Sequence, residues 1–383
     1  MRTTLDGQES GTSTPLRAVR PSIFLMTNTL EVGGSERQFV ELTGALNRQL
    51  FDVQPACLRR TGGLVFRVGE IPEFPPGGSL FRLQAQKARL AMVRFMREKK
   101  TQVAHAFDFY TNIMLAPAAR FAGVPVIIGG HRQIGDLLSP AQFRVQAMAF
   151  RFCDRVICNS QAAATRLREA GIADKKLVVI PNGLPAALFS EVAPAIPKRA
   201  GWVRIGMVAR MNDPVKNHSA FLRAAARLSA ACSTVEFLMV GDGSLRPSLE
   251  KLAGDLGIAE RVTFTGERHD IPAILASLDI SVLVSGSESL SNVVLESMAT
   301  GLPVVANRVG GNPELIRPGE TGDLVEPGNE EQLTTSLLRL VRNPSLRLSY
   351  GANGRAFARS QFHITQIATR YEQLYSSLLQ EKR

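Results

Sequence analysis

The sequence predicts an α/β protein built from two doubly wound domains, and three observations lead to this prediction. Short apolar runs alternate with helical patterns along most of the chain, which is typical of parallel sheets covered by helices. The chain has 383 residues, enough for two domains of ordinary size. A proline-containing stretch, residues 191–201, is interpreted as a linker. We therefore expect domains at 21–190 and 202–355. A helical segment at 356–383 follows them, and a flexible polar tail, residues 1–20, precedes them.

The composition indicates a soluble globular protein. The residues are 45% hydrophobic and 21% charged. No apolar run approaches the roughly 18 residues that a membrane-spanning helix needs. The four cysteines form no Cys-x-x-Cys pair and no cluster with the spacing of a zinc site. We therefore expect a reduced, cytoplasmic protein without a structural metal.

The positive charge lies entirely in the first half of the chain. Residues 1–200 contain 26 Lys and Arg against 15 Asp and Glu, whereas residues 201–383 contain 19 against 19. The densest basic stretch, 80–100, is explained by a sheet-covering helix with a solvated basic face, and docking on an anionic membrane is the alternative. Nucleic acid is not expected as a partner, because aromatic residues make up only 6% and no recognition motif occurs.

The first predicted element is a buried strand at Ser22–Thr27. It leads through Gly33 and Gly34 into a helical pattern that begins near Glu36. A strand, a glycine turn and a helix N-terminus together allow the backbone to approach an anion closely. A plain tight turn is the alternative interpretation.

Two further strands are predicted at Val103–Phe107 and Val124–Ile128. His131 follows the second of them closely, with Arg132 and Asp136 after it. Doubly wound sheets bind ligands at the carboxyl ends of their strands. We therefore expect these side chains to line a ligand-binding edge, although a loop histidine without a task would occupy the same position.

The last predicted strands of the N-terminal half are followed by polar motifs. Asn159 and Ser160 follow one strand and have the residue types that cap helices. Leu177–Ile180 is the next strand and ends in Pro181, Asn182 and Gly183. We interpret Asn159 and Ser160 as a helix cap, with an acceptor contact as the alternative.

The second half begins with a strand at Trp202–Val208. Arg210 and Lys216 follow in one loop, and two cations in such a loop suit a diphosphate, whereas a single basic loop residue usually just faces water. A later strand, Glu236–Val240, is followed by Gly-Asp-Gly, but Arg246 stands where a dinucleotide fingerprint has its third glycine. We interpret this turn as a tight turn only.

The most informative stretch is 285–316, which predicts a short helix between two loops. Ser289, Ser291 and Asn292 are candidates to cap its N-terminus. Gly301 is suited to end it, and Pro303 prevents its continuation. The exposed N-terminus of such a helix has unpaired N–H groups and a partial positive charge, so that a phosphate can bind there.

Two carboxylates, Glu288 and Glu296, flank that helix N-terminus with seven residues between them. The surrounding sequence, SESLSNVVLESMATGLPVVANRVGGNPELI, resembles the nucleotide-sugar site of retaining glycosyltransferases of family 4. The resemblance extends from Ser22 to the C-terminus. It implies the GT-B fold, in which two Rossmann-like domains face a central cleft.

The resemblance also assigns roles to the domains. It implies that residues 21–190 form the acceptor-side domain and that 202–355 bind the nucleotide sugar. The final segment, 356–383, is then expected to cross back to the first domain as a helix.

The same resemblance implies roles for individual residues. Glu296 would bind the ribose hydroxyls, and Glu288 would lie beside the donor sugar. The expected ligands of the donor phosphates are Arg210, Lys216, Gly33, Gly34 and the backbone of Leu290, Ser291, Asn292 and Val293. The remaining expected contacts are His131 with the donor sugar, Arg268 near the base, and Arg132, Asn159 and Ser160 on the acceptor side.

The expected activity is therefore transfer of a sugar, with retention, from a UDP- or GDP-linked donor to a saccharide or lipid-linked acceptor. Surface polysaccharide or lipopolysaccharide synthesis at the cytoplasmic face of a membrane is the expected setting. No divalent metal or other cofactor is expected, since the metal-binding Asp-x-Asp motif does not occur. The alternatives are a nucleotide-sugar epimerase, a phosphorylase, or a catalytically inactive binding protein of the same fold.

Overall fold

The computed structural model describes residues 20–135 and 138–383. The predicted tail up to residue 19 and Asp136 lie outside the described residues. The elements of the N-terminal domain are β1 (Ser22–Thr27), α1 (Gly34–Ala45), β2 (Asp52–Cys57), α2 (Val65–Val68), α3 (Leu83–Glu98), β3 (Thr101–Ala106), α4 (Phe109–Ala122), β4 (Val126–His131), α5 (Pro140–Phe150), β5 (Arg155–Cys158), α6 (Gln161–Glu169) and β6 (Leu177–Val179).

The second domain follows a short connecting segment. Its elements are β7 (Val203–Val208), α7 (His218–Ala231), β8 (Val235–Val240), α8 (Arg246–Asp255), β9 (Val262–Phe264), α9 (Ile271–Ala276), β10 (Ile280–Leu283), α10 (Asn292–Ala299), β11 (Val304–Asn307), α11 (Asn312–Leu315), β12 (Gly322–Val325) and α12 (Glu330–Arg342). Two long helices, α13 (Pro344–Phe362) and α14 (Ile364–Glu381), complete the chain.

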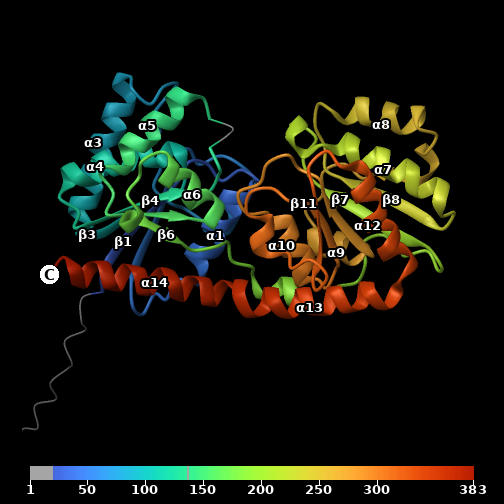
Figure 1. The fold of residues 1–383 in the computed structure, drawn as a ribbon. Coiled ribbons are helices and arrows are strands. Elements are labelled where there is room, and N and C mark those ends of the chain that lie inside the picture. Colours follow the sequence, from blue (N-terminus) through green and yellow to red (C-terminus); the bar gives the residue numbers. More distant parts are fainter. Residues whose placement is uncertain (1–19, 136–137) are drawn as a thin grey trace, which may run out of the picture.

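Each domain contains a parallel six-stranded sheet (Figure 1). The strand orders are β2-β1-β3-β4-β5-β6 and β12-β11-β10-β7-β8-β9. In both sheets the first strand of the domain has later strands on both sides, which is the switch point where doubly wound sheets bind ligands. The predicted α/β fold class with two doubly wound domains is therefore confirmed.

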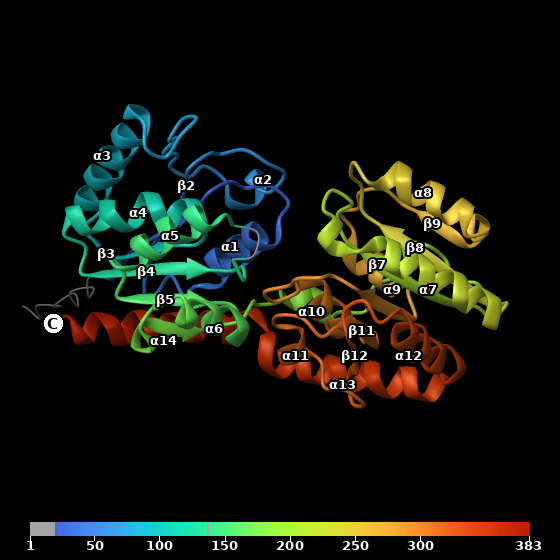
Figure 2. The same cartoon turned by 45° about the horizontal axis from the view of Figure 1, so that its top comes forward.

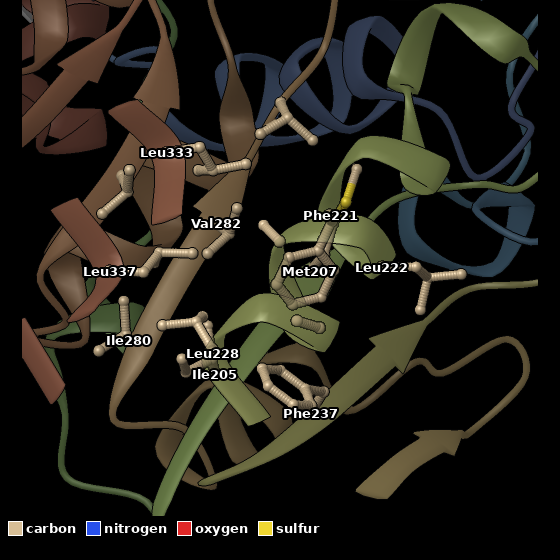
Figure 3. Packing of buried hydrophobic residues seen from close by; sticks show 14 of the residues in the cluster. Ile205, Met207, Phe221, Leu222, Leu228, Phe237, Ile280, Val282, Leu333 and Leu337 are labelled. Carbon is tan, nitrogen blue, oxygen red and sulfur yellow. The ribbon is translucent and has the colours of Figure 1, made fainter. Parts of the chain in front are cut away.

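The central strands β1 and β7 are almost entirely apolar and fully buried, because helices cover both faces of each sheet. All six residues of β1 are buried, and alternate side chains point to opposite faces. Ile23 and Leu25 pack with α1 and α14, whereas Phe24 and Met26 pack with α3 and α4. In the second domain, Met207 of β7 packs with residues of α7 and β10 in the corresponding core (Figure 3).

The edge strand β2 was not predicted, because its sequence DVQPAC contains a proline and has no apolar run. Pro55 lies opposite Leu25 in the register of β1 and β2. A proline is tolerated there because one side of an edge strand donates no ladder hydrogen bonds.

Helix α3 packs on the first sheet, as expected if residues 80–100 form a sheet-covering helix with a solvated basic face. Ala85, Ala88, Met92, Val93 and Met96 are its buried residues. Its basic side chains are exposed except that of Arg89, which is partly buried and donates to the Ile113 carbonyl of α4 at 3.3 Å. Within the described ranges, no helix is long and apolar enough to span a membrane.

The C-terminal segment forms two helices rather than one. Helix α13 lies along the second domain and α14 along the first, and both views show this arrangement (Figure 1, Figure 2). The break occurs at His363, whose extended backbone, with ψ of 133°, interrupts the helix. Tyr371 and Tyr375 of α14 are buried in the core of the N-terminal domain.

The chain therefore passes between the domains twice, and the two passages touch. The Leu184 N–H donates to the Phe362 carbonyl at 2.7 Å, and the Ile364 N–H donates to the Leu184 carbonyl at 2.9 Å. A Cβ on Gly183 would lie 2.5 Å from the end of the Ile364 side chain and 3.2 Å from its Cα, so a larger residue would disturb this contact.

Candidate functional site

A cavity of about 450 Å³ lies between the two domains, and we call it the interdomain cleft. Most of the residues expected at a donor site line it. From the N-terminal domain these are Gly33 and Gly34, and from the second domain Arg210, Lys216, Arg268, Glu288, Leu290, Ser291, Asn292 and Val293. The fold thus brings together residues that are up to 260 positions apart, since Gly33 and Val293 line the same cleft.

The N-terminus of α10 faces this cleft. Ser291 caps the helix, because its hydroxyl accepts a hydrogen bond from the Val294 N–H at 3.3 Å. Gly301 ends it with a positive φ of 83°, as the sequence predicted. Val294, Leu295 and the rest of the inner face are buried, so that the helix N-terminus is fixed in place. Its first N–H groups are available to an anion.

Lys216 and Glu288 form an ion pair inside the cleft. The Lys216 Nζ lies 2.7 Å from Glu288 Oε1. Their two loops are joined, since the Gly286 N–H donates to the Val215 carbonyl at 2.7 Å. A 3₁₀ turn at Pro214–Lys216 fixes the lysine loop, and the turn is capped by Asp213. Both charges are therefore held at the cleft by the second domain alone.

The Gly33-Gly34 turn approaches α10 across the domain boundary. Asn292 donates from Nδ2 to the Gly34 carbonyl at 3.3 Å. A Cβ on Gly34 would lie 2.9 Å from that nitrogen, so a larger residue would displace the asparagine. Asn182 from the end of the N-terminal domain donates to Asn292 Oδ1 at 2.7 Å. Asn292 thus connects α10 to two segments of the other domain.

Glu296 faces a second cavity of about 550 Å³ beside the first, which we call the adjoining cavity. Arg37 and Arg268 line both cavities. Glu296 is 5% exposed, and its Oε1 pairs with Arg37 Nη1 at 2.9 Å. Burial raises the pKa of Glu296, and the Arg37 guanidinium opposes this effect in part. Among the described residues, Glu296 Oε2 has no hydrogen-bond partner.

His131 lies at the carboxyl end of β4, as expected, but the predicted end of that strand at Ile128 was wrong. The histidine is the last residue of β4 itself and is fully buried. Strand β4 continues past Ile128 because Gly129, Gly130 and His131 pair with β5. Burial lowers the pKa of His131 to about 4, so the ring is neutral at pH 7. Its Nε2 has no partner among the described residues.

Arg132 lines a smaller cavity of about 210 Å³ in the N-terminal domain, together with Glu36, Asp108 and Tyr110. Its guanidinium is already engaged. It donates to Asn182 Oδ1 at 2.8 Å and to the Tyr371 hydroxyl at 2.7 Å. It also lies 3.8 Å from the ring centroid of Phe107. Arg132 therefore links the end of β4 to α14 and the domain boundary.

Asn159 contacts the second domain, and Ser160 caps the helix that follows it. Ser160 caps α6, and Asn159 Oδ1 accepts from the Ser289 hydroxyl at 2.6 Å. Glu314 of the second domain accepts from the N–H groups of Gln161 and Ala162 at 2.8 and 2.9 Å. The N-terminus of α6 is thus occupied by a carboxylate of the other domain.

Sequence reasoning did not identify Arg37, Asn182 or Glu314 as residues of the domain boundary. Asn182 is part of the recognised Pro-Asn-Gly motif, and Arg37 follows the recognised Gly-Gly turn by three residues. Their partners lie more than 100 positions away, and only the fold brings them together. Within the described part of the chain, no group of three or more His, Cys, Asp and Glu side chains could hold a metal ion.

Comparison with known proteins identifies the family. The Glycosyltransferase Family 4 model matches residues 32–188, and the Glycosyl transferases group 1 model matches residues 203–343. The lipopolysaccharide core biosynthesis glycosyltransferase LpsE of Rhizobium meliloti (strain 1021) is 32% identical over 346 residues, which are 90% of this chain and 96% of LpsE. This chain belongs to the family 4 glycosyltransferases.

Two further proteins align with this chain over almost its full length. The Escherichia coli UDP-Gal:alpha-D-GlcNAc-diphosphoundecaprenol alpha-1,3-galactosyltransferase is 26% identical to this chain. The alignment covers 92% of this chain and 95% of the galactosyltransferase. The crystal structure of Anabaena Alr3699/HepE in complex with UDP has a TM-score of 0.80 and 23% identity, covering 93% of this chain and 100% of HepE. The likeness shows that this glycosyltransferase has the GT-B fold.

Proposed function

We propose that this glycosyltransferase transfers a sugar, with retention, from a UDP- or GDP-linked donor to a hydroxyl of a saccharide or lipid-linked acceptor. Surface polysaccharide or glycolipid synthesis is the proposed setting. One relative is a lipopolysaccharide core biosynthesis enzyme, and another is a galactosyltransferase for a diphosphoundecaprenol-linked sugar. Their names support this class of acceptor.

The observation that carries the proposal is the charge arrangement in the interdomain cleft. Two cations, Arg210 and Lys216, and the N-terminus of α10 line the same 450 Å³ space. Each of these groups favours a phosphate, and together they suit a diphosphate. In this proposal the backbone of residues 290–293 and the Gly33-Gly34 turn bind the diphosphate, and Arg268 packs near the base.

The same groups would stabilise the leaving group. As the bond between the anomeric carbon and the diphosphate oxygen breaks, negative charge grows on the diphosphate, and fixed cations stabilise this charge most strongly in the transition state. The donor phosphate would compete with Glu288 for Lys216, because the two side chains are now paired at 2.7 Å. We propose that Arg210 and Lys216 supply the positive charge without a divalent metal.

In the proposed single displacement with retention, the acceptor hydroxyl attacks from the side on which the diphosphate departs. The new bond forms between the acceptor oxygen and the anomeric carbon, and the hydroxyl proton passes to the departing phosphate oxygen. Glu288 is proposed to accept hydrogen bonds from hydroxyls of the donor sugar. His131 is proposed to contact the same sugar through Nε2, the buried ring nitrogen without a partner among the described residues.

The acceptor is proposed to bind on the side of the N-terminal domain. The 210 Å³ cavity beside Arg132 contains carboxylates and a half-exposed Tyr110, groups that bind sugar hydroxyls and rings. Asn159 and Ser160 are proposed to contact the acceptor when the second domain moves away from α6, because both now lie at the domain boundary.

An anionic membrane surface is proposed as a further partner. The outer face of α3 combines basic side chains with exposed Leu83 and Leu90, and Phe81 precedes the helix with 63% of its surface exposed. Basic and apolar side chains on one helix face favour the boundary of an anionic bilayer. Sedimentation with anionic and with neutral lipid vesicles tests this partner, and equal binding to both would reject it.

The test of the donor class is a calorimetric binding screen of UDP, GDP, ADP and their common sugar conjugates, with and without Mg²⁺. We expect one nucleoside diphosphate to bind with equal affinity in both conditions. Nuclear magnetic resonance of the product then gives the anomeric configuration. Inversion would reject the retaining mechanism, release of free sugar as the sole product would favour an epimerase, and consumption of orthophosphate would favour a phosphorylase.

A further inference from the structure

Arg37 is a residue of the N-terminal domain whose charged partner lies in the other domain. It stands in the first turn of α1, directly after the Gly33-Gly34 turn. Its Nη1 lies 2.9 Å from Oε1 of Glu296, and the two side chains are 32% and 7% exposed. The arginine lines the interdomain cleft as well as the adjoining cavity. The ion pair therefore connects the two domains at the boundary between the interdomain cleft and the adjoining cavity.

Glu296 needs a cation to remain charged at this position. The residue lies within α10 and is almost completely buried, which disfavours a carboxylate. Arg37 is the cation within salt-bridge distance among the described residues. The second carboxylate oxygen, Oε2, is buried without a partner. Buried polar atoms are nearly always hydrogen-bonded. We therefore interpret this oxygen as the acceptor of a hydrogen bond from a ligand.

We propose that Arg37 is a positioning residue for donor binding, which holds the Glu296 carboxylate by Oε1 from the opposite domain and leaves Oε2 to accept a ribose hydroxyl. This inference rests on the proposed function of Glu296 as the ribose ligand. Arg37 does not touch the donor itself. Its effect is to keep the carboxylate ionised and turned so that one oxygen remains free.

The position of Arg37 has a consequence for the coupling of the domains. Because the arginine belongs to the N-terminal domain, the ribose site is complete only when the two domains are in contact. A ligand that binds the contacting arrangement more tightly shifts the protein toward it, and by the same amount the contact strengthens the ligand. Nucleotide binding and domain closure are thus coupled through one ion pair.

The experiment compares Arg37→Gln, Arg37→Lys and Glu296→Gln, singly and as the double variant Arg37→Gln/Glu296→Gln. The control is Arg155→Gln, because Arg155, whose side chain is 27% exposed, also pairs with a glutamate, Glu381, at 3.3 Å, and neither residue lines the interdomain cleft or the adjoining cavity. Calorimetry measures the dissociation constants of UDP or GDP, whichever the full-length protein binds, and of the matching 2′,3′-dideoxynucleotide. Small-angle scattering measures the compaction that each nucleotide causes.

We expect Arg37→Gln to weaken the ribonucleotide about 10-fold, a loss of about 1.4 kcal/mol, and to weaken the dideoxynucleotide much less. Arg37→Lys should recover part of the affinity, and Arg155→Gln should change neither constant. The double variant should be no weaker than Glu296→Gln, because the arginine acts through the glutamate. Nucleotide-induced compaction should decrease in Arg37→Gln.

Two different failures are distinguishable. If Glu296→Gln leaves both dissociation constants unchanged, the proposed ribose ligand is wrong and the inference falls with it. If Glu296→Gln weakens the ribonucleotide but Arg37→Gln does not, the proposed function stands and the role of Arg37 is rejected. Equal weakening of the ribonucleotide and the dideoxynucleotide in Arg37→Gln would also reject it, because the effect would not pass through the ribose hydroxyls.

Discussion

Glu288 and Glu296 come from one short stretch of sequence, yet their ion-pair partners belong to different domains. Glu288 pairs at 2.7 Å with Lys216 of the same domain, and their loops are hydrogen-bonded to each other. Glu296 pairs at 2.9 Å with Arg37 of the other domain, and its second oxygen is buried without a partner among the described residues. One carboxylate is set by the second domain alone, and the other depends on the contact between domains.

In the proposed mechanism, this difference separates two tasks within one donor site. The pair of Glu288 and Lys216 would act on the sugar and its leaving group whenever the second domain is folded. The pair of Glu296 and Arg37 would support the nucleotide only when the domains meet. Substitutions in the first pair should therefore change turnover, and substitutions in the second should change affinity.

The largest effect is expected from Lys216→Ala. Loss of a fixed cation that stabilises the leaving diphosphate should lower kcat about 100- to 1,000-fold, with a much smaller change in the dissociation constant of the nucleotide. Lys198→Ala is the control, since Lys198 pairs with Asp279 at 2.9 Å at the linker. Equal losses in kcat and in nucleotide affinity would show that Lys216 only positions the donor.

Glu288→Gln should lower kcat about 10- to 100-fold without weakening UDP or GDP, because the nucleotide alone has no sugar for Glu288 to contact. Its neutral amide also leaves Lys216 unpaired for the phosphate. Steady-state kinetics and calorimetry measure the two quantities. The control is Glu326→Gln, which removes an exposed pair with Arg308. A loss of nucleotide affinity as large as that of Glu296→Gln would abolish the distinction between the two glutamates.

Gly34→Ala tests the contact across the domain boundary. The added Cβ would lie 2.9 Å from Asn292 Nδ2 and should displace it from the Gly34 carbonyl. Because α10 then meets α1 less closely, we expect KM for the donor to rise about 3- to 10-fold, corresponding to roughly 1 kcal/mol. Gly44→Ala on the same helix has open space around its Cβ and serves as the control. An unchanged KM would remove Gly34 from the proposed site.

The smallest effect concerns pH. Burial raises the pKa of Glu296 above its ordinary value of 4.5, so the carboxylate gains its proton at a higher pH than an exposed glutamate. Nucleotide affinity should therefore fall as the pH decreases from neutral toward 4.5, beyond the change caused by the phosphates themselves. Glu296→Gln shares the titration of the phosphates but lacks this additional decrease. Parallel pH profiles of the two proteins would contradict the expectation.

The sequence predicted the fold class because strands and helices alternate with clear signals. The apolar run Ser22–Thr27 and the stretch around α10 were recognisable, and the capping by Ser291 and the end at Gly301 followed from residue type. Strand β2 was not recognisable, because an edge strand needs little apolar sequence and tolerates Pro55. Local signals therefore located the central elements better than the edges.

The site was predictable where one segment carries it and less so where two domains share it. The predicted strand ended at Ile128, whereas the structure continues it through Gly129 and Gly130 to His131, because pairing with β5 outweighs the low strand propensity of glycine. Asn159 and Arg132 have residue types that suit ligands, but their hydrogen bonds go to Ser289, Asn182 and Tyr371. Partners so far away along the chain cannot be recognised from the local sequence.

The contact between the two interdomain passages restricts how the protein can move. Leu184 is hydrogen-bonded on both sides of His363, so the two passages form a single short joint beside the cores of both domains. Sliding or independent twisting of one domain would break these bonds, whereas rotation about the joint preserves them. A small rotation at Leu184 would then produce a larger separation between Arg37 and Glu296. The interdomain cleft would open while the hydrogen bonds of Leu184 remain intact.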